Sequence, residues 1–326
     1  MKRLVKCAMA LCVIAAGSLA QAAVWTTIDH PSAGPDGTYP MGISGSNIVG
    51  YYIGDGIGQR GFVYNGSTFT TIEAPAPAAF TWASGIDGEN IIGYYATPTS
   101  PTTSITRGFL LNGATFTTLE CTLPGAVETL PTGIDGANIV GLYYDQAGYP
   151  HGFLYDGTTY VALDDPVGGG ATLQGISGSQ IVGSSYARAF VYDGSVFQEL
   201  APPQASLQRT VASGIDGSNI VGYYDTFGSN DNPPAFQRNG FIFDGSAYRT
   251  LNHPIAGPLG MTQPSDIDGN RVIGSYRGAD GNFHGFITVV PEPAAMWLFS
   301  VAIPVMIRSA RNRVAPPARQ VAENRS

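Results

Sequence analysis

The chain of 326 residues has few charged side chains and only three cysteines. Charged residues make up 12%, while glycine and proline number 43 and 23, a composition that excludes a helical bundle or an α/β enzyme of this size. Hydrophobic residues still reach 44%, which excludes wholesale disorder. The 17 tyrosines and 15 phenylalanines suit many short β-strands.

Residues 1–22 have the features of a cleaved secretory signal peptide. Basic residues at positions 2, 3 and 6 precede an apolar run that ends at Ala20-Gln21-Ala22, a small-residue pattern that signal peptidase accepts. The run is short for a membrane span, and an uncleaved anchor is the alternative. Cleavage would remove Cys7 and Cys12, leaving Cys121 alone and excluding an intrachain disulfide or a cysteine metal cluster.

The C-terminal end has three parts in a fixed order. Val290-Pro291-Glu292-Pro293 is followed by the uncharged run 294–307 and by arginines at 308, 311 and 313. Residues 290–313 resemble the PEP-CTERM sorting signal of Gram-negative bacteria, with an apolar helix after the motif Pro291, Glu292 and Pro293. Pro304 interrupts that helix, and the basic and polar tail 314–326 extends beyond the usual end.

This resemblance implies an address and a partner. An exosortase would recognise the tail during export through the inner membrane, and such proteins accompany exopolysaccharide or biofilm matrix at the cell envelope, cell surface or in the extracellular matrix. A plain C-terminal membrane anchor is the alternative. Between the two ends, residues 23–290 carry 22 acidic residues, eight arginines and no lysine. We therefore expect no nucleic-acid partner, and membrane contact only through the C-terminal segment.

A sequence unit recurs six times between the two ends. Its first copy is Gly42-Ile43-Ser44-Gly45-Ser46-Asn47-Ile48-Val49-Gly50-Tyr51-Tyr52, and later copies begin at Gly85, Gly133, Gly175, Gly214 and, in weaker form, Asp266. Each copy is followed by a Gly-Phe or Ala-Phe strand, and five continue through an Asn-Gly or Asp-Gly pair that suits a tight hairpin. Four antiparallel strands in a period of about 40–50 residues are typical of a propeller blade.

The sixth unit lacks its fourth strand, and a matching strand stands near the N-terminus. Residues 24–31 (VWTTIDHP) match residues 247–254 (AYRTLNHP), which form the fourth strand of the fifth unit. A strand shared between the two ends closes a ring, so the sequence predicts an all-β, six-bladed β-propeller over 23–289. An open β-solenoid or prism is the alternative fold.

The units also resemble the bacterial extracellular HAF repeats. The tripeptide that gives this family its name aligns with Arg188-Ala189-Phe190, and more loosely with His151-Gly152-Phe153 and His284-Gly285-Phe286. The likeness covers all six units and implies an extracellular location and a fold more than an activity.

Two repeated positions border the face that carries the variable loops between second and third strands, where binding usually resides. The first position is the second tyrosine of the Tyr-Tyr pair at the end of the second strand. The second position is the residue directly before the Gly-Phe or Ala-Phe pair of the third strand. The candidate ligand-binding residues are Tyr52, Arg60, Tyr95, Arg107, Tyr144, His151, Tyr186, Arg188, Tyr224, Tyr276 and His284. Aromatic rings stack on sugars and arginine binds carboxylates, so this ring predicts an anionic polysaccharide ligand.

The same residues have a structural explanation. An arginine that begins the third strand lies near the acid that ends the fourth, such as Glu73 or Glu120, so a Tyr–Arg–carboxylate cluster could hold each blade together. Arg209, Arg238, Arg271 and Arg277 fall outside the pattern and are expected to be solvated.

Recognisable catalytic motifs are missing. There is no Gly-x-Ser-x-Gly elbow, His-Glu-x-x-His or phosphate loop. Asp164-Asp165 could form the paired acids of a glycosidase, but the strand-end position is acidic in other units too. We expect a non-enzymatic binding or structural module for extracellular polymer or proteins, with no cofactor and no metal. A polysaccharide lyase or glycoside hydrolase on a propeller scaffold is the alternative.

Overall fold

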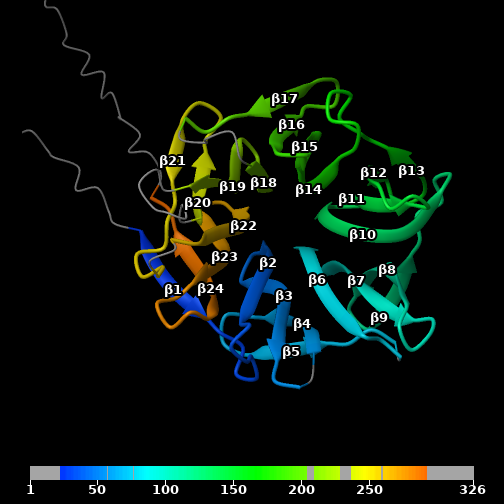
Figure 1. Cartoon of the computed structure of the whole chain (residues 1–326), viewed down its shortest axis with the longest axis horizontal. Helices are drawn as coiled ribbons and strands as arrows, with labels where there is room; N and C mark the ends of the chain where they lie inside the picture. Colours follow the sequence, from blue (N-terminus) through cyan, green and yellow to red (C-terminus); the bar gives the residue numbers. More distant parts are fainter. Residues whose placement is uncertain are drawn as a thin grey trace, which may run out of the picture. The chain divides into compact units, whose positions relative to one another are not determined.

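The computed structural model describes residues 23–56, 58–75, 77–203, 209–227, 236–257 and 260–291. They form 24 β-strands in six four-stranded antiparallel sheets around a central axis (Figure 1). The signal peptide predicted for 1–22 and the tail from Glu292 onward lie outside these residues. Within the described part of the chain, no helix is found that could cross a membrane.

Each sheet contains the strands of one sequence unit in chain order, and we number these blades one to six. Blade one has β2 (Thr38–Ser44), β3 (Asn47–Gly54), β4 (Gly58–Tyr64) and β5 (Phe69–Ile72), and blade two has β6 (Phe80–Asp87), β7 (Asn90–Pro98), β8 (Ser104–Asn112) and β9 (Thr115–Leu119). Blade three has β10 (Ala126–Asp135), β11 (Asn138–Asp145), β12 (Pro150–Tyr155) and β13 (Tyr160–Ala162), and blade four has β14 (Thr172–Ser177), β15 (Gln180–Ser185), β16 (Arg188–Tyr192) and β17 (Phe197–Leu200). Blade five has β18 (Arg209–Asp216), β19 (Asn219–Phe227), β20 (Phe236–Phe243) and β21 (Tyr248–Thr250).

Blade six is assembled from both ends of the folded region. It has β22 (Thr262–Asp268), β23 (Arg271–Arg277) and β24 (Phe283–Val289), and its outermost strand is β1 (Val24–Ile28). β1 pairs with β24 in antiparallel register, with Val24 opposite Val289. The Trp25 ring lies 5.1 Å from the Phe286 ring and 4.8 Å from the His253 ring. The predicted six-bladed propeller and its closure by the N-terminal strand are confirmed, and the open solenoid is excluded.

Six phenylalanines form the repeated centre of the blade cores. They come from the Gly/Ala-Phe motif and are almost completely buried: Phe62, Phe109, Phe153, Phe190, Phe241 and Phe286. Each ring is paired with a glycine of the second strand, as Phe109 is with Gly93. A Cβ on Gly93 would lie 2.6 Å from the Phe109 ring, so the repeated glycine and the repeated phenylalanine form one contact.

A chain of hydrogen bonds links each blade to the next at one end of the axis. Each innermost strand ends in a serine or aspartate whose side chain accepts the N–H of the turn glycine in the following blade. The acceptors are Ser44, Asp87, Asp135, Ser177, Asp216 and Asp268, at 2.5–3.1 Å, and we call them the acidic ring. The turn glycines adopt φ of 55–62°, which glycine tolerates without steric cost.

Closure through β1 predicts a large effect from its one large side chain. Replacement of Trp25 by alanine should lower the free energy of unfolding by about 2 kcal/mol, because the half-buried indole packs between two blades. Urea unfolding measures this difference. The matched control is Thr26→Ala on the same strand, where the side chain is exposed and the change should stay within about 0.5 kcal/mol. Equal effects of the two substitutions would contradict closure through β1.

Candidate functional site

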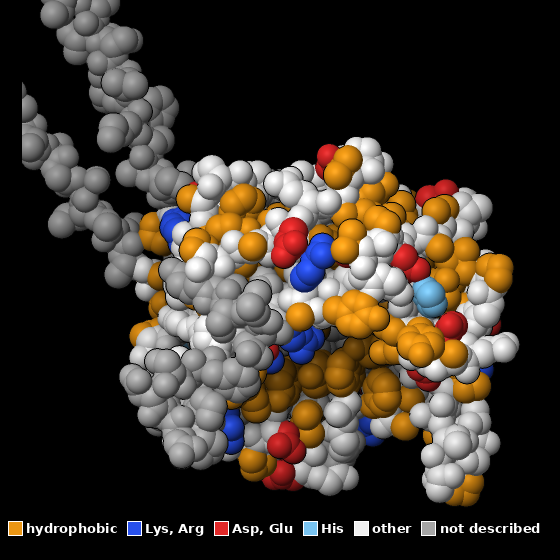
Figure 2. All heavy atoms as spheres, turned by 45° about the horizontal axis from the view of Figure 1, so that its top comes forward, with side chains coloured by type: hydrophobic (Ala, Val, Ile, Leu, Met, Phe, Trp, Pro, Cys, Tyr) orange, Lys and Arg blue, Asp and Glu red, His pale blue; other side chains and the backbone are white. Residues whose placement is uncertain are grey.

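The innermost strands surround a channel along the axis of the ring. One end is a cavity of about 170 Å³ bordered by the acidic ring, and the other is a wider cavity of about 460 Å³ that we call the funnel. Ser84, Thr132 and Gln174 line both cavities, so the two are continuous. The funnel opens on the face that carries the loops between second and third strands, and Figure 2 shows hydrophobic and basic side chains around the hollow in this face.

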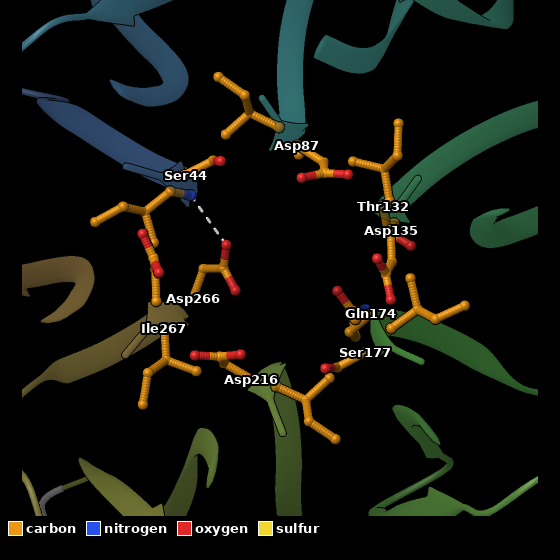
Figure 3. Close-up of a pocket in the computed structure, with 18 of the residues that line it drawn as sticks. Ser44, Asp87, Thr132, Asp135, Gln174, Ser177, Asp216, Asp266 and Ile267 are labelled. Carbon is orange, nitrogen blue, oxygen red and sulfur yellow. Dashed lines mark hydrogen bonds between the residues drawn. The ribbon is translucent and has the colours of Figure 1, made fainter. Parts of the chain in front are cut away.

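Asp266 breaks the symmetry of the channel. It stands where the other five blades have the glycine of a Gly-Ile pair, and its carboxylate points toward the axis (Figure 3). The carboxylate accepts the Ile43 N–H at 3.0 Å, which joins blades six and one. Gly214 leaves room for it, since a Cβ there would lie 2.6 Å from the Asp266 Oδ1 atom. Burial, with nearby Asp268 and Asp216, raises the pKa of Asp266 to about 7.

Four aromatic side chains form one wall of the funnel, and we call them the aromatic wall: Tyr39, Tyr51, Trp82 and Tyr94. The Tyr51 and Trp82 rings are stacked at 4.0 Å with an angle of 2° between their planes. Tyr39 stacks on the other side of Tyr51 at 4.8 Å, and Tyr94 lies 5.3 Å from Trp82. The Trp82 Nε1–H donates to the Gln59 Oε1 atom at 2.6 Å and fixes the indole.

The tyrosine phenols are neutral at physiological pH, and their ionisation is made still less favourable by burial. Burial raises the pKa of Tyr39 to about 12, with a smaller contribution from Asp36, and it raises the pKa of Tyr51 and Tyr94 as well. The aromatic wall therefore offers uncharged ring faces and hydroxyl groups at physiological pH.

Two arginines of blade five lie on the other side of the funnel. The Arg238 guanidinium donates to both carboxylate oxygens of Asp225, at 2.8 and 3.2 Å, and lies 4.3 Å over the Tyr223 ring. The expectation that Arg238 is solvated was wrong, because Asp225 is buried and needs this partner. Arg209 is exposed, and among the described residues no acidic side chain forms an ion pair with it. Arg209 is thus the cation of the funnel that can take an anionic group.

The predicted tyrosines lie in two environments. Tyr52, Tyr95, Tyr224 and Tyr276 are only 3–7% exposed and pack inside the blades, away from the funnel. The side chain that reaches the funnel belongs to the residue before each of them in the strand, which is Tyr51, Tyr94, Tyr223 or Ser275. Successive side chains of a strand point to opposite faces, and this alternation was the signal that could have identified the first tyrosine.

The structure also corrects the alignment of two predicted residues. In blade one, Arg60 of the third strand lies opposite Tyr52 of the second. In blade three, the equivalent residue His151 lies opposite Tyr143, so Tyr143 corresponds to Tyr52 and the predicted Tyr144 is one residue further on. In β15 Arg188 lies opposite Ser185, and Tyr186 follows in the turn. The error arose because Leu142 and Ser184-Ser185 replace one or both tyrosines of the motif.

The predicted cations take part in clusters within the blades. Arg107 pairs with Glu120 at 2.8 Å, His151 with Asp164 at 2.7 Å, Arg188 with Glu199 at 3.4 Å and His284 with Asp29 at 2.7 Å. Asn239 and Asn252 form the uncharged version at 2.9 Å, and Arg60 donates to the Gln59 carbonyl at 3.4 Å. All of these contacts except that of Arg60 join strand three to strand four, and they favour the structural explanation for the repeated position.

Two histidines of these clusters have shifted proton affinities. The hydrogen bond with Asp164, together with Asp145, raises the pKa of His151. Burial acts against protonation of His284, but Asp29 and Asp280 outweigh it, so the pKa of His284 is raised. Asp164 is thus a partner of His151, and Asp165 is buried and accepts the Val167 N–H at 3.0 Å, so neither is a free acid of a paired site.

The described residues contain no group of three or more His, Cys, Asp or Glu side chains placed to hold a metal ion. Cys121 is half-buried, and burial raises the pKa of its thiol, which disfavours the reactive thiolate.

Comparisons with known proteins concern the architecture. No family model and no curated protein matches the chain. Similar solved structures include the six-bladed, fucose-recognising lectin of Aleuria aurantia, at 15% identity and TM-score 0.43 over 68% of this chain and 80% of that one. TolB from Acinetobacter baumannii has 15% identity and TM-score 0.44 over 76% and 65%. A subtype N11 neuraminidase-like protein from A/flat-faced bat/Peru has 12% identity and TM-score 0.43 over 82% and 94%. At these values the likeness is one of propeller fold alone.

The raised pKa of Asp266 predicts a pH-dependent stability. The carboxyl binds its proton more tightly in the folded chain than in the unfolded one, so stability should fall as the pH rises from about 4 to about 7. Asp266→Asn keeps the acceptor for the Ile43 N–H and removes the charge. We expect this variant to be more stable than the wild type by about 1–3 kcal/mol at pH 8.

Denaturant unfolding between pH 4 and pH 8 tests this expectation. The difference between the two proteins should vanish near pH 4, which makes the acidic measurement an internal control. A constant difference across the range would show that Asp266 is not the titrating group.

Proposed function

We propose that this protein is an exported, non-enzymatic binding propeller that takes an acidic extracellular polysaccharide in the funnel. The observation that carries the proposal is the pairing of the aromatic wall, in blades one and two, with the exposed Arg209 in blade five. Blades two and five are opposite each other in a ring of six, so a ligand in the funnel would meet rings on one side and a cation on the other.

The chemistry of the funnel suits a sugar chain. Aromatic faces pack against the C–H faces of pyranose rings, and the fork of a guanidinium matches a carboxylate. In the floor, the Gln174 amide can both donate and accept, while the Ser84 and Thr132 hydroxyls, which donate to backbone carbonyls, can accept. One free arginine in a strongly acidic protein favours a polymer with a carboxylate on some of its units over a dense polyanion.

Residues outside the described structure would supply the location. The signal peptide at 1–22 would direct export, and the PEP-CTERM-like tail would be the partner of an exosortase that places the propeller at the cell surface or in the matrix. Of the motif itself, only Pro291 is described, and its carbonyl accepts a 3.4 Å hydrogen bond from the Arg249 guanidinium.

A second candidate function is favoured by Asp266. An unrepeated acid with a pKa near 7, in a channel that opens into the funnel, is the kind of group that acts as a general acid or base in a lyase or glycoside hydrolase. Release of new sugar ends from a bound polymer, abolished by Asp266→Asn, would support this alternative over simple binding.

Substitution of the indole in the aromatic wall tests the binding function. Trp82→Ala should raise the Kd for an oligouronide of six to eight units about tenfold, because one stacking platform is lost. Calorimetric titration of the segment 23–291, which contains all 24 strands, measures the change. Trp82→Phe keeps a ring and should retain most of the affinity. Equal binding of a neutral glucan of the same length, or an unchanged Kd in Trp82→Ala, would contradict the proposal.

Truncation tests the proposed role of the tail. A chain that ends at Val290 keeps every strand and should be released from the cell envelope into the medium, because the anchor and the sorting motif are both lost. Fractionation of cells that express the full and truncated chains measures this distribution. Unchanged retention of the truncated protein would show that another part of the chain holds it.

A further inference from the structure

Blade four carries the main irregularity of the funnel face. Its second and third strands are joined by only two residues, Tyr186 and Ala187. Tyr186 has φ of 53°, and it is the one non-glycine residue with positive φ in the part of the chain that the structure describes. Its side chain is 87% exposed and buries almost nothing. A large side chain in the left-handed region costs free energy that asparagine or glycine would largely avoid, so Tyr186 has no structural reason to be there.

A cavity lies beside this tyrosine. Its volume is about 310 Å³, and it is formed by three blades: Tyr149 and Pro150 from blade three, the segment 168–172 and Ser184 to Tyr186 from blade four, and Arg209 from blade five. We call it the blade-four pocket. Tyr149 is 66% exposed, so two solvent-facing aromatic rings belong to this one cavity.

Blade four lacks two rings that blades one and six have at the corresponding place. His30 stacks on Tyr52 of blade one at 3.6 Å, and His253 stacks on Tyr276 of blade six at the same distance. The register puts Ser185 at the tyrosine position of blade four, and the strand-end motif puts Asp165 at the histidine position. Of these two residues, Ser185 lines the cavity, on the side where the other blades have a larger tyrosine ring.

The lining of the pocket combines apolar surface with polar groups that lie close to the backbone. Gly168 packs directly on Ser185, since a Cβ at Gly168 would overlap the Ser185 hydroxyl. That hydroxyl is buried and has no hydrogen-bond partner among the described residues. The Thr172 and Ser184 hydroxyls lie 2.9 Å apart at the inner side of the pocket. The glycine backbone, two exposed rings and one guanidinium match a sugar unit with a carboxylate.

We propose that the blade-four pocket holds one anionic sugar unit, at a chain end or branch, of the polymer whose neighbouring units lie in the funnel. Thr172, Ser184 and Arg209 line both cavities, and Arg209 is the cation among them. This inference rests on the proposed function, and it adds that a single pocket in one blade selects the charged unit while the aromatic wall holds the chain.

The variant Tyr186→Asn separates binding from folding. Asparagine adopts positive φ readily, so the Tm of the variant should be equal to or higher than that of the wild type. The Kd for a uronate disaccharide and for an oligouronide of six to eight units should both rise about tenfold. Tyr149→Ala should weaken the same two ligands. Val196→Ala, an exposed residue on the same blade, is the control and should change neither.

Trp82→Ala distinguishes this inference from the function on which it rests. It should weaken the longer ligand while leaving the disaccharide bound. If Tyr186→Asn binds both ligands like the wild type while Trp82→Ala loses the longer one, the pocket is overturned and the funnel stands. If only Tyr186→Asn loses binding, the funnel is overturned and the pocket stands. If the wild type binds neither uronate, both proposals are overturned.

Discussion

The close approach of the six innermost strands is the constraint on which the rest of the ring depends. A Cβ added at Gly42 would lie 2.8 Å from the Gly85 Cα atom, and one at Gly133 would lie 2.9 Å from the Gly175 Cα atom. In five blades this position therefore carries no side chain, and in blade six Asp266 fits because the neighbouring Gly214 has none. The same closeness brings each turn glycine within hydrogen-bonding distance of the acidic ring, so packing and hydrogen bonding join the blades at the same place.

Closure then makes the stability of each blade depend on its neighbours. With Cys121 as the one described cysteine, no disulfide holds the ring, and the pairing of β1 with β24 brings together residues more than 250 positions apart in the chain. Removal of that strand would leave β24 with an unpaired edge and the Phe286 side of blade six without its Trp25 cover. The two ends of the propeller thus meet at Trp25, the largest side chain of β1.

The sequence predicted the period, the hairpins and the closing strand, because each is a local pattern that repeats. The prediction of which tyrosines face the funnel was less successful. It depended on which of two adjacent tyrosines turns toward the axis, and the alignment of blades three and four was shifted by one residue at Leu142 and Ser185. The contact between Asp266 and the Ile43 N–H spans 223 residues, and the stack of Tyr51 on Trp82 crosses from one blade to the next. Such contacts follow from the closed ring, and no local pattern reveals them.

Repetition and its exceptions have different meanings in this protein. The phenylalanines, the turn glycines and, in four blades, the strand-end ion pairs recur because the blades need the same contacts, so their recurrence says nothing of a ligand. Trp82, Arg209, Tyr186 and Asp266 do not recur, and each lies on the funnel, the pocket beside it or the channel below it. A ring that needed only to fold would have no reason to place an exposed tyrosine at positive φ. The residues that depart from the symmetry of the ring lie on one face and along the axis below it. Their common location favours a ligand-binding role for this face.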